Sequence, residues 1–356
     1  MDLSDRFQTL HEVVRAARLN LTQNLWDYLV GATATETTML RNRHALDSIG
    51  FRPRVLVDVS SIDTTASLYG HKIRLPVALA PVGGLDQLAP GGGATVARGA
   101  GLAGVPFFLS SVTELTLEAV SAAASGPRIF QLYVRGDHAW VDDHARRAIA
   151  SGYDGFCITV DSALYSRRER DIANRYAKPW RASAEPSFQA SVTWDDIARF
   201  RDTHDVPLIL KGIATAEDAD RACALGVSGV YVSNHGGRQL DHGAGAIEVL
   251  PEVVAAVAKR ALVMVDGGFS RGSDIVKAIA LGADLVGIGR LYCYGFAAAG
   301  AAGIARVIKL LEIEVAECLG LLGLSSFEGL DPSYLRPVQP VVAPHVLSAF
   351  PLLERQ

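Results

Sequence analysis

Cysteine and metal-binding motifs are scarce in this chain. Its 356 residues include only four cysteines, Cys157, Cys223, Cys293 and Cys318, which are far apart and lie in apolar stretches. This spacing argues against a CxxC metal site and against the disulfide framework of a small secreted protein. His235 is not part of an HExxH motif, and no His/Cys/Asp cluster has the spacing of metal ligands. We therefore predict no metal and a reducing, cytoplasmic environment.

Long apolar runs and blocks of one charge are also missing. No uninterrupted apolar segment reaches the roughly 18 residues that span a bilayer, and the N-terminus lacks the basic and apolar regions of a signal peptide. The net charge is -4, and no basic block offers a track for a phosphate backbone. We expect neither a membrane anchor, nor secretion, nor a nucleic-acid partner.

Two common enzyme motifs are absent as well. There is no GxSxG elbow and no GxGxxG that opens a βαβ unit, so the serine hydrolase and nicotinamide dinucleotide interpretations lose support. The composition, 49% hydrophobic with 34 glycines, allows a large core and argues against disorder.

From about residue 75, short apolar runs alternate with alanine-rich amphipathic stretches, which is typical of repeated βα units around a parallel sheet. The predicted strands are 75–81, 106–111, 128–134, 155–161, 207–212, 229–235, 261–268 and 285–290. The predicted helices between them include 194–203, 216–225, 247–259 and 272–281. Eight successive units favour an α/β fold of the (β/α)8 TIM barrel type, with a doubly wound sheet as the alternative.

The remaining segments complete one expected domain over residues 1–356. Residues 1–74 form an N-terminal helical and extended segment that could close one end of the barrel. The barrel and a last helix over 304–322 occupy 75–322, and the proline-containing tail 323–356 is expected to be extended. A long connection after strand four, residues 162–193, is expected to cover the site.

Polar residues gather at the C-terminal ends of the predicted strands. They are Ser110, Gln131, Tyr133, Thr159, Asp161, Lys211, Ser233, His235, Asp266, Gly289 and Arg290. Any one of them could simply mark where a strand stops, but seven strands share the pattern. Because barrel enzymes place their active sites at this face, we interpret these residues as lining a site.

The stretch 233–241, Ser-Asn-His-Gly-Gly-Arg-Gln-Leu-Asp, is the most informative. The paired glycines allow a sharp turn, so His235 and Arg238 can face the same bound molecule. This combination suits proton abstraction from an anionic substrate, although a lone histidine after a strand is more often structural.

The following strands supply partners for this pair. Lys211 could stabilise developing negative charge, or form an ordinary salt bridge. Asp266 is expected to lie near His235 and to hold its imidazolium form. The glycine turns after strands seven and eight, 267–268 and 287–290, indicate a phosphorylated ligand. On residue type alone, Arg168 suits a solvated face and Tyr28 a half-buried helix.

Several motifs together closely resemble the FMN-dependent 2-hydroxy acid oxidase/dehydrogenase family, which includes glycolate oxidase, lactate oxidase and mandelate dehydrogenase. They are the stretch 233–241, Asp266-Gly267-Gly268, Gly289-Arg290, Phe130-Gln131-Leu132-Tyr133, Thr159-Val160-Asp161 and Lys211-Gly212. The resemblance implies a barrel that holds FMN and oxidises an L-2-hydroxy acid to the 2-oxo acid. Reduced flavin would pass its electrons to oxygen or another acceptor.

The resemblance also assigns roles. His235 would be the base with Asp266 as its partner. Tyr28, Arg168 and Arg238 would hold the substrate carboxylate, for which a guanidinium fork is well suited, and Tyr133 its hydroxyl. Lys211 would stabilise reduced flavin. The other expected cofactor contacts are Pro81, Val82, Gly83, Ser110, Gln131, Thr159, Ser233, Asp266, Gly267, Gly268, Arg271, Gly289 and Arg290.

Two departures from the family pattern stand out. Ser270, followed by Arg271, replaces a common arginine after the Asp-Gly-Gly turn, and Gly83 resembles the mandelate dehydrogenase version of its position, which hints at an acceptor other than oxygen. The resemblance further implies a homo-oligomer, a tetramer. The alternatives are an FMN-binding barrel of a non-redox class, an isomerase or lyase, and a non-catalytic flavin-binding homologue.

Overall fold

Eight parallel strands close into a barrel in this computed structural model, which describes residues 3–176 and 186–353. The strands are β4 (Val77–Leu79), β5 (Phe107–Ser110), β6 (Arg128–Leu132), β7 (Gly155–Thr159), β8 (Leu208–Ile213), β9 (Gly229–Val232), β10 (Leu262–Val265) and β11 (Leu285–Ile288). Their order around the barrel is β10-β11-β4-β5-β6-β7-β8-β9. The (β/α)8 prediction is confirmed, and the doubly wound alternative is wrong.

The interior of the barrel is filled by one side chain from each strand. These are Ala78, Phe108, Ile129, Cys157, Ile209, Tyr231, Met264 and Leu285. Leu68 and Ile73, from the hairpin of β2 (Ala66–Leu68) and β3 (His71–Ile73), pack against this cluster. The barrel centre is therefore packed, and the hairpin covers one of its ends, as expected for part of the N-terminal segment.

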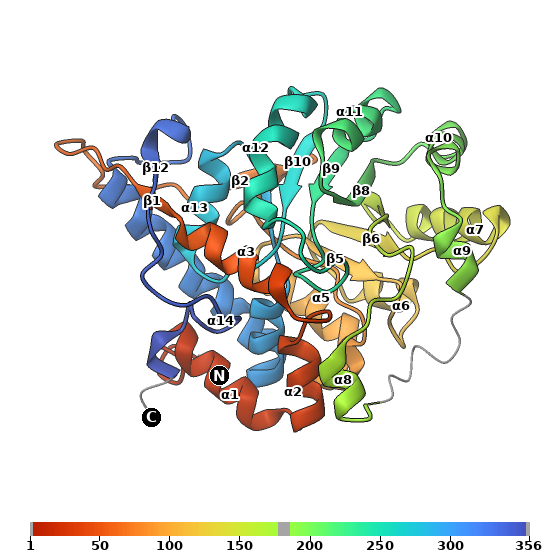
Figure 1. Cartoon of the computed structure of the whole chain (residues 1–356), viewed down its shortest axis with the longest axis horizontal. Helices are drawn as coiled ribbons and strands as arrows, with labels where there is room; N and C mark the ends of the chain where they lie inside the picture. Colours follow the sequence, from red (N-terminus) through yellow and green to blue (C-terminus); the bar gives the residue numbers. More distant parts are fainter. Residues whose placement is uncertain (1–2, 177–185, 354–356) are drawn as a thin grey trace.

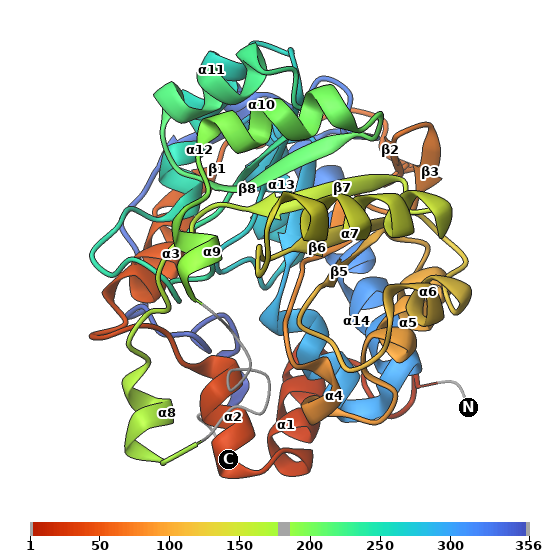
Figure 2. The ribbon, with the colours of Figure 1, turned by 90° about the vertical axis from the view of Figure 1, so that its right-hand side faces the viewer.

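Helices surround the barrel, as Figures 1 and 2 show. Between the strands lie α4 (Leu85–Leu88), α5 (Gly92–Ala103), α6 (Leu117–Ala122), α7 (His138–Ala150), α8 (Glu169–Ala173), α9 (Pro186–Ala190), α10 (Trp194–Thr203), α11 (Ala216–Ala224), α12 (Ala246–Val257) and α13 (Gly272–Ala280). The four helices predicted from periodicity are α10 to α13, and their ends agree within two residues.

The last helix is longer than expected. The helix α14 runs over Arg290–Leu322, and its continuity breaks at Ala299 and Gly300, where the backbone leaves helical geometry. The predicted helix over 304–322 is the part that follows this kink. The first part begins directly at the end of β11, at the barrel mouth.

The two ends of the chain meet on the outside of the barrel. The helices α1 (Leu10–Asn20), α2 (Gln23–Val30) and α3 (Thr37–Asp47) precede β1 (Ile49–Phe51), which pairs with β12 (Leu335–Pro337). The tail is not simply extended: it includes two short 3-10 helices, 332–334 and 351–353, and returns to α1. There Phe350 is buried with its ring against His11.

Candidate active site

A cavity of about 340 Å³ opens at the C-terminal ends of the strands, within the usual size range of small-molecule sites. Its wall includes residues 162–165, Arg168 and Gln189 from the connection after β7. These residues of the connection therefore lie over the site, as predicted, whereas 177–185 fall outside the described residues. The helices α2 and α3 contribute Tyr28, Leu29, Met39, Asn42 and Arg43.

The segment after β9 contains three consecutive residues with positive φ angles. His235, Gly236 and Gly237 have φ angles of +58°, +65° and +77°, in the left-handed region that disfavours residues with a Cβ. A Cβ on Gly237 would lie 2.5 Å from the backbone nitrogen of Met39, so only glycine permits this close approach to α3. The strained turn holds His235 in the cavity wall.

The imidazole of His235 lies between a carboxylate and a phenol. Its Nδ1 is 3.1 Å from Oδ1 of Asp161, and its Nε2 is 3.1 Å from the Tyr133 hydroxyl. Because a carboxylate only accepts, Nδ1 carries the hydrogen and Nε2 keeps its lone pair. The expectation that Asp266 orients His235 is wrong: the carboxylate in contact is that of Asp161.

Asp266 serves a different group. Its Oδ2 is 3.2 Å from Nζ of Lys211, and its Oδ1 accepts a hydrogen bond of 2.6 Å from Ser233 Oγ, which itself accepts from Lys211. Lys211 is buried, and an ammonium withdrawn from water needs a counter-charge. Lys211 therefore pairs with the Asp266 carboxylate, and His235 pairs with the Asp161 carboxylate.

The protonation state of His235 follows from its surroundings. Burial lowers the pKa of its imidazole, Asp161 acts in the opposite direction, and the positive charges of Lys211 and Arg168 lower it further. The net shift is downward, so the ring is neutral near pH 7. The Nε2 lone pair of this neutral imidazole accepts from the Tyr133 hydroxyl, and when a substrate hydroxyl approaches Nε2 the ring can act as a general base.

Two arginines crowd the same wall of the cavity. The pKa of Arg238 is lowered to about 10 by burial and by the charge of Arg168. The Arg238 guanidinium lies over the Tyr28 ring and donates to the backbone carbonyls of Tyr28 and Gly31. The Nε of Arg168 is buried and has no hydrogen-bond partner in the described part of the chain. Crowded cations of this kind favour binding of an anion.

The part of the cavity at the start of α14 has features of a phosphate site. The helix α14 begins at Arg290 without a side-chain cap on its first turn, and Gly267, Gly268 and Gly289 line the cavity beside it. Uncapped N–H groups at a helix N-terminus bind anions well. The guanidinium of Arg290 donates to the carbonyls of residues 29, 31 and 236, so it adds positive charge while holding the surrounding turns together.

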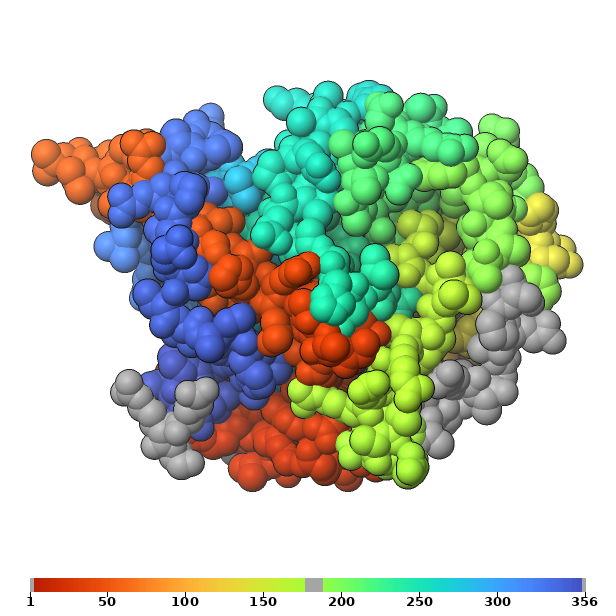
Figure 3. Space-filling model, viewed as in Figure 1, coloured from red at the N-terminus to blue at the C-terminus, as the bar shows by residue number. Residues whose placement is uncertain are grey.

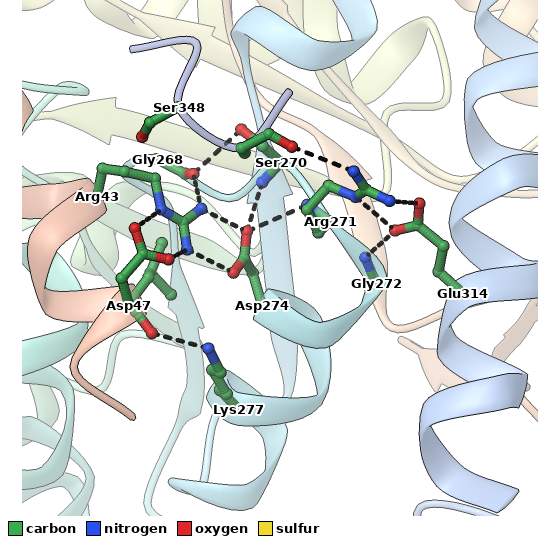
Figure 4. A network of polar contacts seen from close by, with 12 residues as sticks. Arg43, Asp47, Gly268, Ser270, Arg271, Gly272, Asp274, Lys277, Glu314 and Ser348 are labelled. Atoms are coloured by element: carbon green, nitrogen blue, oxygen red, sulfur yellow. Dashed lines mark hydrogen bonds and ion pairs between the residues drawn. The ribbon is translucent and has the colours of Figure 1, made fainter. Parts of the chain in front are cut away.

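Arg271 does not reach this cavity, and its expected cofactor contact is wrong. It donates to the Glu314 carboxylate on α14, over 2.6 and 3.1 Å, and to the Ala349 carbonyl in the tail (Figure 4). Glu314 provides a close counter-ion that lies far from Arg271 in sequence. The arginine therefore attaches the C-terminal segment to α13 and α14 rather than binding a ligand.

A buried ion pair between Arg43 and Asp274 lies beside the cavity, next to the turn that follows β10. Arg43 donates to both carboxylate oxygens of Asp274, over 2.8 and 2.9 Å, and also to Asp47 (Figure 4). The pKa of Arg43 is raised, because the two carboxylates outweigh its burial. Ser270 donates its backbone N–H to Asp274, so the turn after β10 is fixed by this pair.

Apart from Arg271, which lies outside the cavity, the predicted residues fall into two groups. Pro81, Val82, Gly83, Tyr28, Tyr133, Arg168, Lys211, His235, Arg238, Asp266, Gly267, Gly268, Gly289 and Arg290 line the cavity. Ser110, Gln131, Thr159 and Ser233 are buried at the strand ends. The pairing of Asp161 with His235 was not predicted from the sequence, and neither were Arg135, Gln189, His345 and Val346, which line the cavity. The position of Asp161 at the end of β7 was the signal that could have identified it.

Known proteins resemble this chain along most of its length. A family model described as FMN-dependent dehydrogenase matches residues 17–337. The L-lactate oxidase of Nostoc sp. is 36% identical over 92% of this chain and 97% of its own. The 4-hydroxymandelate oxidase of Amycolatopsis orientalis is 37% identical over 90% and 96%. The chain belongs to the FMN-dependent 2-hydroxy acid oxidase/dehydrogenase family.

Solved structures agree with this assignment. A soluble mutant of the membrane-associated (S)-mandelate dehydrogenase from Pseudomonas putida superposes with a TM-score of 0.87 at 34% identity, over 92% of this chain and 99% of that one. A mandelate oxidase variant with (S)-mandelic acid gives 0.87 at 38% identity, over 94% and 100%. The protein is thus an FMN-dependent oxidoreductase of 2-hydroxy acids. Within the described ranges, no helix is long and apolar enough to cross a bilayer, and no cluster of side chains suits a metal ion.

The buried polar groups at the strand ends fit FMN. Gln131 donates its amide to Thr159 Oγ1, but its buried Oε1 lacks a hydrogen-bond partner among the described residues. An unpaired buried acceptor is costly, and an N–H of the isoalloxazine ring would satisfy it. The ammonium of Lys211 lines the same cavity, and the uncapped α14 N-terminus suits the phosphate.

Proposed function

We propose that this protein oxidises an L-2-hydroxy acid to the 2-oxo acid with His235 as the base. The observation that carries the proposal is the contact pattern of the imidazole, with Nδ1 on Asp161 and Nε2 directed to the Tyr133 hydroxyl. Nε2 accepts one proton from the substrate. Asp161 then stabilises the imidazolium that forms, in the way a carboxylate supports the histidine of a catalytic dyad.

The arginines orient the substrate for this proton transfer. Arg238 and Arg168 bind its carboxylate, and Tyr28 borders the same place, with its hydroxyl 3.1 Å from the Gly83 carbonyl. Tyr133, already in contact with the base, hydrogen-bonds the substrate hydroxyl. Positioning of this kind lowers the barrier because the reacting groups meet at a fixed geometry.

The cofactor is held by the strand ends and by the α14 N-terminus. FMN, when bound, supplies the acceptor for the electron pair that leaves the substrate. Lys211, with its pKa raised because Asp266 and Asp161 outweigh its burial, keeps a positive charge beside that acceptor. Ser110, Gln131, Thr159 and Ser233 hold the ring, and Gly268, Gly289 and Arg290 the phosphate.

The direct test uses the purified protein with bound FMN. Lactate, glycolate, mandelate and longer 2-hydroxy acids are added without oxygen, and the flavin absorbance is recorded. Bleaching by at least one acid supports the proposal. Retained FMN that no acid bleaches would instead favour a non-redox barrel or a non-catalytic flavin-binding homologue.

The pH dependence of catalysis should follow His235. Its pKa in the free enzyme lies below the ordinary 6.5, with burial as the main cause. Since the neutral ring is the active base, kcat/KM should be level near pH 7 and fall only as the pH drops through this lowered pKa. The rate of flavin reduction, measured as a function of pH, shows where this acidic decline of kcat/KM begins. A decline that already begins above pH 7 on acidification would contradict the expectation.

The final electron acceptor is proposed to be oxygen or another acceptor, and Gly83 is the feature that points to an acceptor other than oxygen. Gly83 lines the cavity, and a Cβ at this position would lie 2.9 Å from Cβ of Val112. This sequence position resembles that of mandelate dehydrogenase. Parallel measurements of peroxide formation and of dye reduction, after reduction by one substrate, decide between the two kinds of acceptor.

We also propose a cytoplasmic homo-oligomer, a tetramer by family resemblance. The segment after β1 projects from the body of the molecule (Figure 3, orange), and its Val55, Leu56 and Val57 are exposed. A contiguous exposed apolar surface favours association. Leu56→Asp should therefore lower the molar mass measured by light scattering, with Leu240→Asp, at another exposed leucine, as the control. An unchanged mass would exclude this segment as the contact.

A further inference from the structure

Arg135 is a cation in the cavity wall without a counter-charge. It lies two residues beyond Tyr133, is half-buried, and lines the same cavity as His235. No residue within 3–176 or 186–353 forms an ion pair or a hydrogen bond with its guanidinium. Burial lowers its pKa, while Tyr133 acts in the opposite direction. A guanidinium partly withdrawn from water is stabilised when an anion binds beside it.

The position of Arg135 excludes the flavin phosphate as that anion. Arg135 follows β6, which stands opposite β10 in the ring of eight strands. The features suited to phosphate, Gly268 and the N-terminus of α14, belong to β10 and β11. The anion that Arg135 accommodates therefore lies across the barrel mouth, on the side of Tyr133.

The substrate carboxylate also has its own partners. Arg168 and Arg238 form a pair in which the charge of the first lowers the pKa of the second. They follow β7 and β9, whereas Arg135 follows β6. Arg135 therefore belongs to a different strand end from either arginine of this pair. An anion at Arg135 must be a second charged group, carried some distance along the substrate from the reacting carbon.

The surrounding wall suits a short chain that ends in such a group. Gln189 fixes the connection, since its Oε1 accepts from the Val134 backbone N–H over 2.7 Å and its Nε2 donates to the Thr159 carbonyl over 3.0 Å. Four apolar residues that follow the adjacent strands β5, β6 and β7 line the same cavity: Val112, Val134, Ala163 and Leu164. They can contact methylene groups between the two charged ends.

We propose that Arg135 binds a distal carboxylate and that the preferred substrates are 2-hydroxy dicarboxylic acids. The proposal rests on the proposed function, because it names the substrate class of the same site. Arg168 and Arg238 hold the carboxylate next to the hydroxyl, and Arg135 holds the one at the far end. Discrimination arises because a substrate without the distal charge leaves this guanidinium unpaired.

The first experiment compares acids of equal length in the holoenzyme. Anaerobic flavin reduction is followed with 2-hydroxyglutarate and 2-hydroxyvalerate, and with malate and 2-hydroxybutyrate. We expect at least one diacid to exceed its matched monoacid by roughly tenfold or more in kcat/KM, as for a charge-assisted contact. Equal or better reduction by both monoacids would overturn the proposal without affecting the proposed function.

The second experiment removes the charge and keeps the side-chain length. Arg135→Met should lower kcat/KM for the preferred diacid by roughly tenfold and change that for its monoacid by less than about threefold. Arg146→Met, at an exposed arginine on α7, is the control that should change neither. An equal loss with both acids would assign Arg135 a structural role and contradict the proposal.

A binding measurement distinguishes failure of the distal carboxylate site from failure of the proposed oxidation reaction. Glutarate and valerate lack the hydroxyl and cannot be oxidised, so their dissociation constants are read from the perturbed flavin spectrum. Tighter binding of glutarate in the native protein, lost in Arg135→Met and partly kept in Arg135→Lys, supports the distal site even if no tested acid reduces the flavin. Equal binding of both acids would refute it.

Discussion

His235→Gln is expected to retain FMN and to lose reduction by substrate by roughly 10²- to 10⁴-fold, the usual contribution of a general base. Glutamine is close in size and can still contact Asp161 and Tyr133, but its amide cannot take a proton at neutral pH. The FMN-facing groups that we propose, Lys211 and Gln131, are unchanged. Stopped-flow absorbance at saturating substrate measures the loss, and the flavin spectrum reports cofactor content.

The conservative change Tyr133→Phe is the matched control for this result. It removes the hydroxyl 3.1 Å from Nε2 and leaves the base in place, so it should cost less than His235→Gln. Near-normal flavin reduction by His235→Gln would remove this residue as the base. Loss of FMN from both variants would point to a structural role for the contact instead.

The barrel itself could be predicted from the sequence because each part of the pattern is local. Apolar runs of strand length recur between amphipathic stretches, and the four helices expected from periodicity appear as α10 to α13. The kink at Ala299 and Gly300 was not predicted, because an alanine-rich and glycine-rich stretch suits both a continuous and an interrupted helix. The return of the tail to α1 was not predicted either, because it depends on burial of Phe350 against His11, a residue far away in the sequence.

The partners of charged residues were harder to predict than the charged residues themselves. His235 and Lys211 each need a carboxylate, and the sequence places both Asp161 and Asp266 at strand ends. Which carboxylate meets which cation depends on side-chain directions across the barrel, and the strained backbone of His235 turns its ring to Asp161. Arg271 illustrates the same limit, because its partner Glu314 lies on a helix that packs beside it only in the folded chain.

Asp161→Asn should lower the rate of flavin reduction by roughly 10²-fold or more while FMN stays bound. The carboxylate holds the hydrogen of His235 on Nδ1, which leaves Nε2 free to accept a proton. An asparagine can donate from its amide to Nδ1 instead, which places the hydrogen on Nε2 and removes the base. The same change also removes the charge that stabilises the imidazolium. Single-turnover reduction under anaerobic conditions measures the effect.

The pH profile tests whether Asp161 acts through the base. Asp161 raises the pKa of His235 against the effect of burial, so Asp161→Asn should move the acid limb of its residual activity to lower pH. Asp266→Asn is the matched comparison: it leaves the buried ammonium of Lys211 without its carboxylate, and should weaken flavin binding or thermal stability more than it moves this limb. If Asp266→Asn moved the limb and Asp161→Asn did not, Asp266 would be the orienting carboxylate after all.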